Sequence, residues 1–218
     1  MPVRAVLLDL YDTLAWTDWE PLRVALGERL GLDGPLLARA FRETRAARNV
    51  GTHDDAAGDW EAVLAWAGVN APRSVVIDAA SLEHALLRDA VHLYPESLEV
   101  VAELHERGVK TALVSNCSHA TRPIVDRLGL SESFDAVILS FEVGARKPQP
   151  EIYRAALAAV GDAEPSDAVF VDDQAGYCDA AVALGIRSFL IERGGEPREE
   201  RGAEHERLPD LTSLLQQI

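Results

Sequence analysis

The stretch that most constrains this chain is VLLDLYDTL, at residues 6–14. Residues 6–8 form a short apolar run without polar alternation, which is typical of a strand buried on both faces of a parallel sheet. Asp9 follows at the end of that run, where open α/β sheets bind their ligands. Asp12 and Thr13 favour a tight turn directly afterwards. We therefore expect a carboxylate at a sheet edge next to solvent; the plain alternative is an Asp that only caps a helix.

Composition and charge limit the class of protein. Of the 218 residues 48% are hydrophobic, and no apolar run is long enough to span a bilayer. The N-terminus has no signal-peptide pattern, so we expect a cytoplasmic protein. The formal net charge of −15 argues against nucleic acid or an anionic membrane as partner but permits a small anionic substrate held by local donors or a metal. Cys117 and Cys178 form no C-x-x-C pair, which predicts two buried thiols.

The rest of the chain divides into two kinds of pattern. Residues 15–91 show helical spacing and no convincing strand, which predicts a helical subdomain over 15–92. From Pro95 onward, predicted helices and strands alternate. The strands are expected at 109–114, 136–139, 168–171 and 187–191. The helices are expected at 96–107, 121–128, 150–160 and 178–184. This alternation predicts a parallel sheet with right-handed crossovers, hence an α/β core built from residues 1–14 and 93–218.

Two segments near the C-terminus are less regular. Residues 193–209 are polar and charged, which predicts either a short helix near 198–207 or a mobile loop. Residues 211–218 carry leucines at a spacing that predicts a terminal helix docked on the core.

Two groups of side chains in the helical region each have two interpretations. All four tryptophans of the chain lie there: Trp16, Trp19, Trp60 and Trp66. We expect at least two of them to fill the core of the helical subdomain, the alternative being a pocket lining that faces the first strand. Four arginines recur at every third residue: Arg39, Arg42, Arg45 and Arg48. We expect a solvated helix face with salt bridges, the alternative being a rim that attracts anions.

Polar side chains end four of the predicted strands: Asp9, Ser115-Asn116, Ser140 and Asp172-Asp173. Because crossovers place these strand ends at one sheet edge, we expect Asp9 to lie near Asp172 and Asp173. Three carboxylates repel one another unless a cation lies among them, and an all-oxygen site suits Mg²⁺. Two prolines fix the backbone around Lys147, from where it reaches a bound anion or a carboxylate.

Four motifs in this order resemble the haloacid dehalogenase superfamily of hydrolases. They are DLYDTL from Asp9, Ser115-Asn116, Lys147-Pro148, and Asp172-Asp173 followed by AAVALGI at 180–186. The resemblance covers residues 1–14 and 93–218. It implies a Rossmann-like doubly wound parallel sheet as the core. It also implies that the segment 15–92 is a helical cap that selects the substrate.

The resemblance implies a mechanism centred on Asp9. In the family's phosphatases this Asp attacks phosphorus and forms an aspartyl-phosphate, which water then hydrolyses. Mg²⁺ would be held by Asp9, the backbone carbonyl of Tyr11 and Asp173. Asp172 would assist directly or through water.

The same resemblance implies how the phosphoryl group is bound. Ser115 Oγ and the backbone N–H of Asn116 would donate to phosphoryl oxygens. Lys147 would pair with both Asp9 and the phosphate.

Tyr11 departs from the phosphatase pattern, which has an acid–base Asp two residues after the nucleophile. A Tyr, with a reference pKa near 10, is a poor base at neutral pH. Tyr at this position resembles the superfamily's 2-haloacid dehalogenases, which attack carbon, expel halide and need no metal. Those enzymes lack the acid pair that Asp172-Asp173 provides and carry Gly where this chain has Asp12.

The acid pair therefore favours a Mg²⁺-dependent phosphohydrolase acting on a small phosphorylated metabolite. One alternative is a metal-independent 2-haloacid dehalogenase. The other is a non-catalytic member that binds a ligand or a protein.

Overall fold

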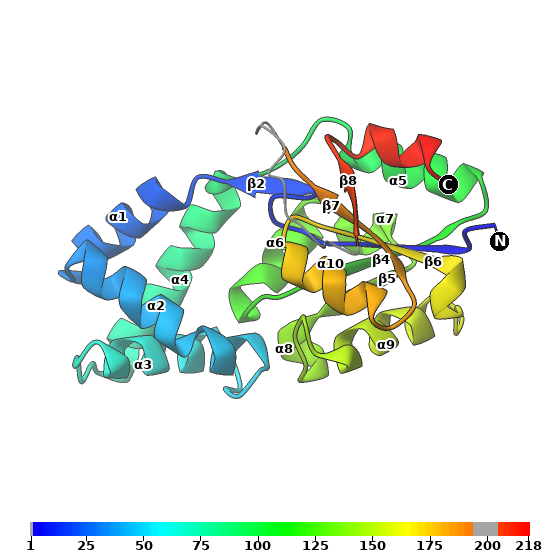
Figure 1. Ribbon diagram of the computed structural model, residues 1–218. Helices are drawn as coiled ribbons and strands as arrows, with labels where there is room; N and C mark the ends of the chain where they lie inside the picture. Colours follow the sequence, from blue (N-terminus) through cyan, green and yellow to red (C-terminus); the bar gives the residue numbers. More distant parts are fainter. Residues whose placement is uncertain (1, 194–204) are drawn as a thin grey trace.

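The centre of the protein is a parallel β-sheet (Figure 1). The structure is a computed structural model that describes residues 2–193 and 205–218. Within these residues the sheet has six strands in the order β5-β4-β1-β6-β7-β8, all paired in parallel. The strands are β1 (Ala5–Leu8), β4 (Lys110–Ser115), β5 (Ala136–Leu139), β6 (Ala168–Asp172), β7 (Arg187–Ile191) and β8 (Glu206–Leu208). The first strand lies in the middle, so the chain winds outward from it in both directions.

Both faces of the sheet are buried. Val6 and Leu8 belong to the apolar cluster on one face, and Ala5 and Leu7 belong to the cluster on the other. One face packs against α5 (Ser97–Glu106), α6 (Arg122–Arg127), α7 (Leu130–Ser133) and the 3-10 helix η3 (Thr212–Gln216). The other face packs against α9 (Pro150–Ala159) and α10 (Ala175–Val182). This arrangement confirms the predicted α/β, Rossmann-like, doubly wound fold.

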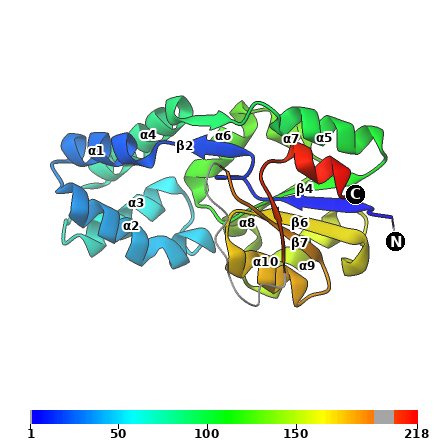
Figure 2. The same ribbon diagram turned by 45° about the horizontal axis from the view of Figure 1, so that its top comes forward.

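Four helices between β1 and β4 form a separate layer at one end of the sheet, on the left in Figure 1 and again in the turned view of Figure 2. They are α1 (Trp19–Leu30), α2 (Gly34–Asn49), α3 (Ala56–Trp66) and α4 (Arg73–Ala90), together called the helical insert. Two of them begin at a capping aspartate: Asp33 accepts from the Leu36 N–H, and Asp55 accepts from the Gly58 N–H.

The prediction that residues 15–91 contain no strand was wrong. Two short strands pair antiparallel where the chain enters and leaves the helical insert. They are β2 (Ala15–Thr17) and β3 (Val91–Leu93). Each strand has only three residues, too few for an alternating pattern to stand out from the neighbouring helices. This pairing holds together the two chain segments that connect the helical insert to the core.

The C-terminal expectations need correction too. Most of the helix expected near 198–207 lies outside the described residues, but residues 206–208 form β8 beside β7 rather than a helix. The last helix is a single 3-10 element, Thr212–Gln216. Elsewhere the predicted strands at 136–139 and 187–191 have the observed bounds. The helix predicted at 178–184 begins earlier, at Ala175.

The remaining short elements of the core lie between its strands. They are η1 (His119–Thr121), α8 (Ser140–Val143) and η2 (Pro165–Asp167). Cys117 and Cys178 are both buried and unpaired, as predicted. Among the described residues, no helix combines the length and the apolarity that crossing a bilayer requires.

Only one tryptophan fills the interior of the helical insert. Trp60 is 1% exposed and packs edge-on against Phe41, whereas Trp16, Trp19 and Trp66 are exposed. The expectation that at least two would be buried was therefore wrong. Aliphatic side chains fill most of that interior: Leu26, Leu37, Val63, Leu64, Val76 and Leu87.

The helical insert contacts the core directly. The buried carboxylate of Asp59 in α3 accepts from the His119 backbone N–H at 3.3 Å and lies 2.9 Å from His119 Nδ1. Its other oxygen lies 2.9 Å from His53 Nδ1. Close by, Gly51 packs against the backbone carbonyl of Phe141 in α8.

We predict that Gly51→Ala destabilises the protein more than Gly31→Ala. Both glycines have left-handed φ angles, +65° and +64°, so both substitutions carry the same strain of about 1–2 kcal/mol. A Cβ at Gly51 would overlap the Phe141 carbonyl, whereas at Gly31 it meets nothing within 4 Å. Thermal unfolding should show a drop of about 2–4 °C per kcal/mol, larger for Gly51→Ala. Equal drops would contradict a tight contact at Gly51.

Candidate active site

The carboxyl ends of three neighbouring strands converge on one cavity. Strands β4, β1 and β6 lie side by side, so the residues that end them meet at the same sheet edge. The cavity has a volume of about 830 Å³ and lies between this edge and the helical insert. Of the residues predicted for the site, six line it: Asp9, Tyr11, Ser115, Asn116, Lys147 and Asp173. Asp172 lies behind them and is fully buried.

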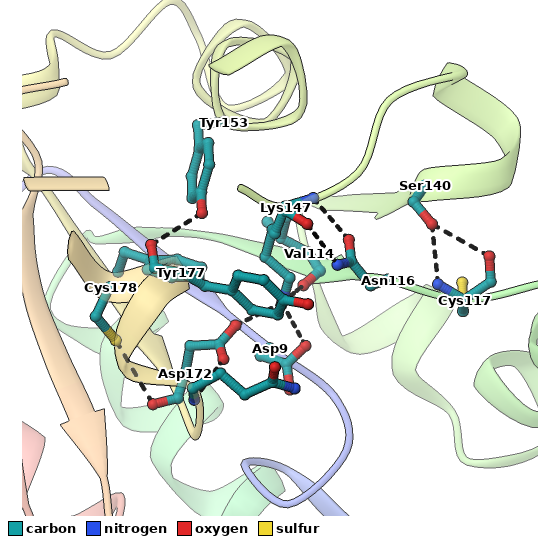
Figure 3. Close-up of polar contacts among 12 residues, drawn as sticks. Asp9, Val114, Asn116, Cys117, Ser140, Lys147, Tyr153, Asp172, Tyr177 and Cys178 are labelled. Carbon is teal, nitrogen blue, oxygen red and sulfur yellow. Dashed lines mark hydrogen bonds and ion pairs between the residues drawn. The ribbon is translucent and has the colours of Figure 1, made fainter. Parts of the chain in front are cut away.

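Lys147 is the centre of this site (Figure 3). Its Nζ lies 2.5 Å from Asp9 Oδ1, 2.6 Å from Asp172 Oδ2 and 2.9 Å from the Val114 carbonyl oxygen. The ammonium has three donors, and these three acceptors use all of them. Burial acts to lower the pKa of Lys147, but the two carboxylates outweigh it and raise the pKa. The side chain therefore remains a fixed positive charge.

The predicted acid cluster is present. Asp9, Asp172 and Asp173 each place a carboxylate oxygen within 4.8 Å of the others. Both carboxylate oxygens of Asp172 have protein partners. One accepts from Lys147 Nζ, and the other accepts from the Gln174 N–H at 2.8 Å. Asp9 and Asp173 therefore have the carboxylate oxygens best able to face a cation.

The electrostatics of the cluster favour an added cation. Burial raises the pKa of Asp9, an effect that Lys147 partly offsets. Burial, followed by repulsion from Asp9 and Asp12, raises the pKa of Asp173 to about 6. One ammonium does not balance three carboxylates, and the donor set is oxygen only, so the residues fit a hard divalent cation.

Ser115 and Asn116 differ in how they are bonded. Ser115 Oγ is buried and has no hydrogen-bond partner among the described residues. The Asn116 side chain pairs with the backbone of Lys147: its Oδ1 accepts from the N–H at 2.7 Å, and its Nδ2 donates to the carbonyl at 2.9 Å. It thus holds the segment that carries Lys147. The sequence prediction assigned Asn116 only a backbone role, since no spacing rule connects residues 116 and 147.

Tyr11 provides no acid–base group at neutral pH. Its hydroxyl lies 3.4 Å from Thr121 Oγ1, and its ring packs against Trp19 at 5.2 Å between centroids. Burial raises the pKa of the Tyr11 phenol above its ordinary value. Asp12 also lines the cavity, on a left-handed turn with φ of 61°, and partial burial raises its pKa.

The arginine row does not form the uniform solvated face that was expected. Arg39, Arg42 and Arg45 are exposed, but Arg48 is only 7% exposed. Arg42, Arg45 and Arg48 all line the cavity. The exposed members agree with the expected solvated face, whereas the position of Arg48 at the cavity fits the alternative of a rim that attracts anions.

Comparison with known proteins identifies the family. The sequence model of one protein family, described as haloacid dehalogenase-like hydrolase, matches residues 3–185. This chain belongs to that family. A phosphoserine phosphatase of Thermus thermophilus is 31% identical over 246 residues, covering 98% of each chain. A phosphoglycolate phosphatase of Cereibacter sphaeroides is 30% identical over 131 residues, 56% of this chain and 59% of its own.

Solved structures of the family share the fold. A HAD phosphatase from Thermococcus onnurineus is 23% identical with a TM-score of 0.67, covering 98% of this chain and 97% of its own. An L-2-haloacid dehalogenase from Xanthobacter autotrophicus with chloropropionic acid covalently bound is 22% identical with a TM-score of 0.69 and the same coverage. Because a phosphatase and a dehalogenase share the fold, the fold does not distinguish these two reactions.

We predict that Mg²⁺ stabilises the protein more at pH 8 than at pH 5. The folded-state pKa of Asp173, about 6, exceeds its ordinary value of 3.8. The stability linked to its protonation is therefore present below about pH 4 and is lost as pH rises through 6. At pH 8 the ionised cluster needs a cation, whereas at pH 5 a proton already reduces the repulsion. Thermal unfolding with Mg²⁺ or chelator at both pH values measures the difference.

Asp173→Asn is the control for this experiment. It removes one charge from the cluster and should reduce the Mg²⁺-dependent gain in melting temperature at pH 8. A gain that is the same at both pH values, or unchanged in the variant, would contradict a cation site at these carboxylates.

Proposed function

We propose that this protein is a Mg²⁺-dependent phosphohydrolase that acts on a small phosphorylated metabolite. The observation that carries the proposal is the clustering of Asp9, Asp172 and Asp173 around one lysine at the cavity. Such a cluster has a clear use when a cation and an anionic phosphate complete it. A relative called a phosphoserine phosphatase, similar over nearly the whole chain, supports the same reaction class.

In this mechanism Asp9 is the nucleophile. Its carboxylate attacks phosphorus, and the bond to the leaving-group oxygen breaks with its electron pair. Water then attacks phosphorus, which releases phosphate and regenerates the Asp9 carboxylate. Lys147 holds Asp9 in position throughout, because its own three acceptors are protein atoms.

The remaining residues would bind the ion and the phosphoryl group. Asp9, the backbone carbonyl of Tyr11 and Asp173 would hold Mg²⁺, with Asp172 assisting. The bound ion would screen the repulsion between carboxylate and phosphate. Ser115 Oγ, buried at the cavity and without a hydrogen-bond partner in the described part of the chain, is well suited to donate to a phosphoryl oxygen. The backbone N–H of Asn116 would donate to another.

Tyr11 restricts the leaving group. Because its phenol does not exchange a proton at neutral pH, the leaving-group oxygen departs without protonation by this residue. Activated esters and acyl phosphates, whose leaving groups are stable as anions, should therefore be hydrolysed faster than alkyl phosphates of similar size.

A metal-independent 2-haloacid dehalogenase is the second candidate. Tyr11 favours it, since a departing halide needs no proton. The acid cluster counts against it, because that reaction has no use for Asp172-Asp173 around a cation. A non-catalytic binding role has the loss of an acid at Tyr11 as its only support.

We predict phosphate release from a panel of phosphomonoesters and an acyl phosphate with Mg²⁺, and its loss with chelator. Asp9→Asn should lower the rate by at least about 10³-fold, because it removes the nucleophile. Halide release from a 2-haloacid without metal is measured in parallel. Halide release without phosphate release would establish the dehalogenase instead, and neither product would support the binding role.

We predict that Tyr11→Asp accelerates hydrolysis of alkyl phosphates more than that of 4-nitrophenyl phosphate. Acid–base assistance is worth about 10²–10⁴-fold, which is the upper limit of the gain for a poor leaving group. Tyr11→Phe, which adds no acid, is the matched control and should give no gain. Equal gains for both substrates would show that proton transfer does not limit turnover.

A further inference from the structure

Arg48 is an unusual arginine in this structure. It lies near the C-terminal end of α2 and lines the cavity from the side of the helical insert. It is 7% exposed, and its Nε donates to Thr44 Oγ1 at 3.1 Å while Nη2 donates to the Phe41 carbonyl at 2.9 Å. The guanidinium carbon also lies 4.8 Å from the centre of the Phe41 ring. These contacts fix the orientation of the guanidinium.

The charge of Arg48 has no direct partner in the described residues. Within 4.0 Å, none of their carboxylates forms an ion pair with it, and its Nη1 makes no hydrogen bond to them. The carboxyl of Glu83 lines the same cavity, but it accepts from Trp60 Nε1 at 2.7 Å. The guanidinium of Arg45 adds a second positive charge nearby.

Burial of the Arg48 guanidinium costs free energy through desolvation, and the carboxylates of Glu83 and Asp59 offset this cost only from beyond ion-pair distance. Arginine keeps its proton in proteins, so the cost is not relieved by neutralisation. An anion that enters the cavity and contacts Arg48 would offset this desolvation cost at close range. The formal charge of the chain is −15, so arginines that line the cavity are significant for attracting an anionic ligand.

We propose that Arg48, with Arg45 and Asn49 beside it, binds a second anionic group on the substrate. The substrate is then a small phosphomonoester that also carries a carboxylate or a second phosphate. Both groups match the planar fork of a guanidinium, which donates two parallel hydrogen bonds to either. Asn49 is buried and lines the cavity next to Arg48. This inference rests on the proposed phosphohydrolase activity.

The test compares substrates that differ only in the second anion. One arm is a series of phosphorylated hydroxy acids of increasing chain length, and another is the bisphosphates of the corresponding diols. The reference is the phosphorylated simple alcohol of each length. The wild type should show a higher kcat/KM for one anionic series at a particular chain length. The series with the higher kcat/KM identifies the second anion as a carboxylate or a phosphate.

Arg48→Gln and Arg39→Gln form a matched pair of variants. Both remove one positive charge from α2, but Arg39 is exposed, lies 6.0 Å from the Trp66 ring and does not line the cavity. Arg48→Gln should reduce the preference for the anionic substrate by about 30-fold or more in kcat/KM, mainly through KM. Arg39→Gln should leave the preference unchanged, and Arg48→Lys should retain part of it.

Three results would overturn the inference. One is the absence of any preference for an anionic series in the wild type. Another is an equal loss for charged and neutral substrates in Arg48→Gln, which would indicate a structural role through Thr44 and Phe41. The third is an equal effect of Arg39→Gln.

A binding measurement separates this inference from the proposed function. The same compounds are titrated by calorimetry into Asp9→Asn, with and without Arg48→Gln. If the wild type releases phosphate from none of them and from no acyl phosphate either, the phosphohydrolase proposal fails. Binding to Asp9→Asn that weakens about 30-fold on losing Arg48 would still support the anion site, and binding that is unchanged would overturn it.

Discussion

The ion pairs of Lys147 with Asp9 and Asp172 are the interaction on which the rest of the site depends. They connect the ends of β1 and β6, and the bond to Val114 adds β4. Removing one partner of such a buried pair costs about 3–5 kcal/mol, because the remaining charge is left uncompensated. Asn116 supports the arrangement by holding the backbone of Lys147 through two hydrogen bonds. The carboxylates are thus fixed in position before any ligand binds.

The core and the helical insert contribute different parts of the cavity. The sheet edge supplies a cluster of acids, a buried lysine and the buried hydroxyl of Ser115, all suited to a cation and a phosphoryl group. The helical insert supplies guanidinium groups. It is held against the core by the Asp59 carboxylate and by the tight contact at Gly51. A ligand enclosed between the two parts would meet opposite charges at its two ends.

Much of this arrangement follows from local sequence. Apolar runs that end in Asp9, Ser115 and Asp172 identify strands and place their polar ends at one edge, because parallel crossovers leave no other arrangement. Features that depend on tertiary contacts could not be found in this way. The β2–β3 pair is too short to show a period, and the pairing of Asn116 with Lys147 joins distant segments. Arg48 shares its spacing with exposed arginines, and only the packing of α2 decides which one is buried.

The central claim is that Asp9 takes up the phosphoryl group. Tyr11 offers no base to activate water, so hydrolysis of the aspartyl-phosphate should be slow enough for it to accumulate. The most direct measurement is mass spectrometry of the protein after rapid acid quenching during turnover of an acyl phosphate with Mg²⁺. The account predicts one added phosphoryl group on the peptide that contains Asp9, absent in Asp9→Asn. Phosphate release with Asp9 unmodified, or with the phosphoryl group on another residue, would contradict it.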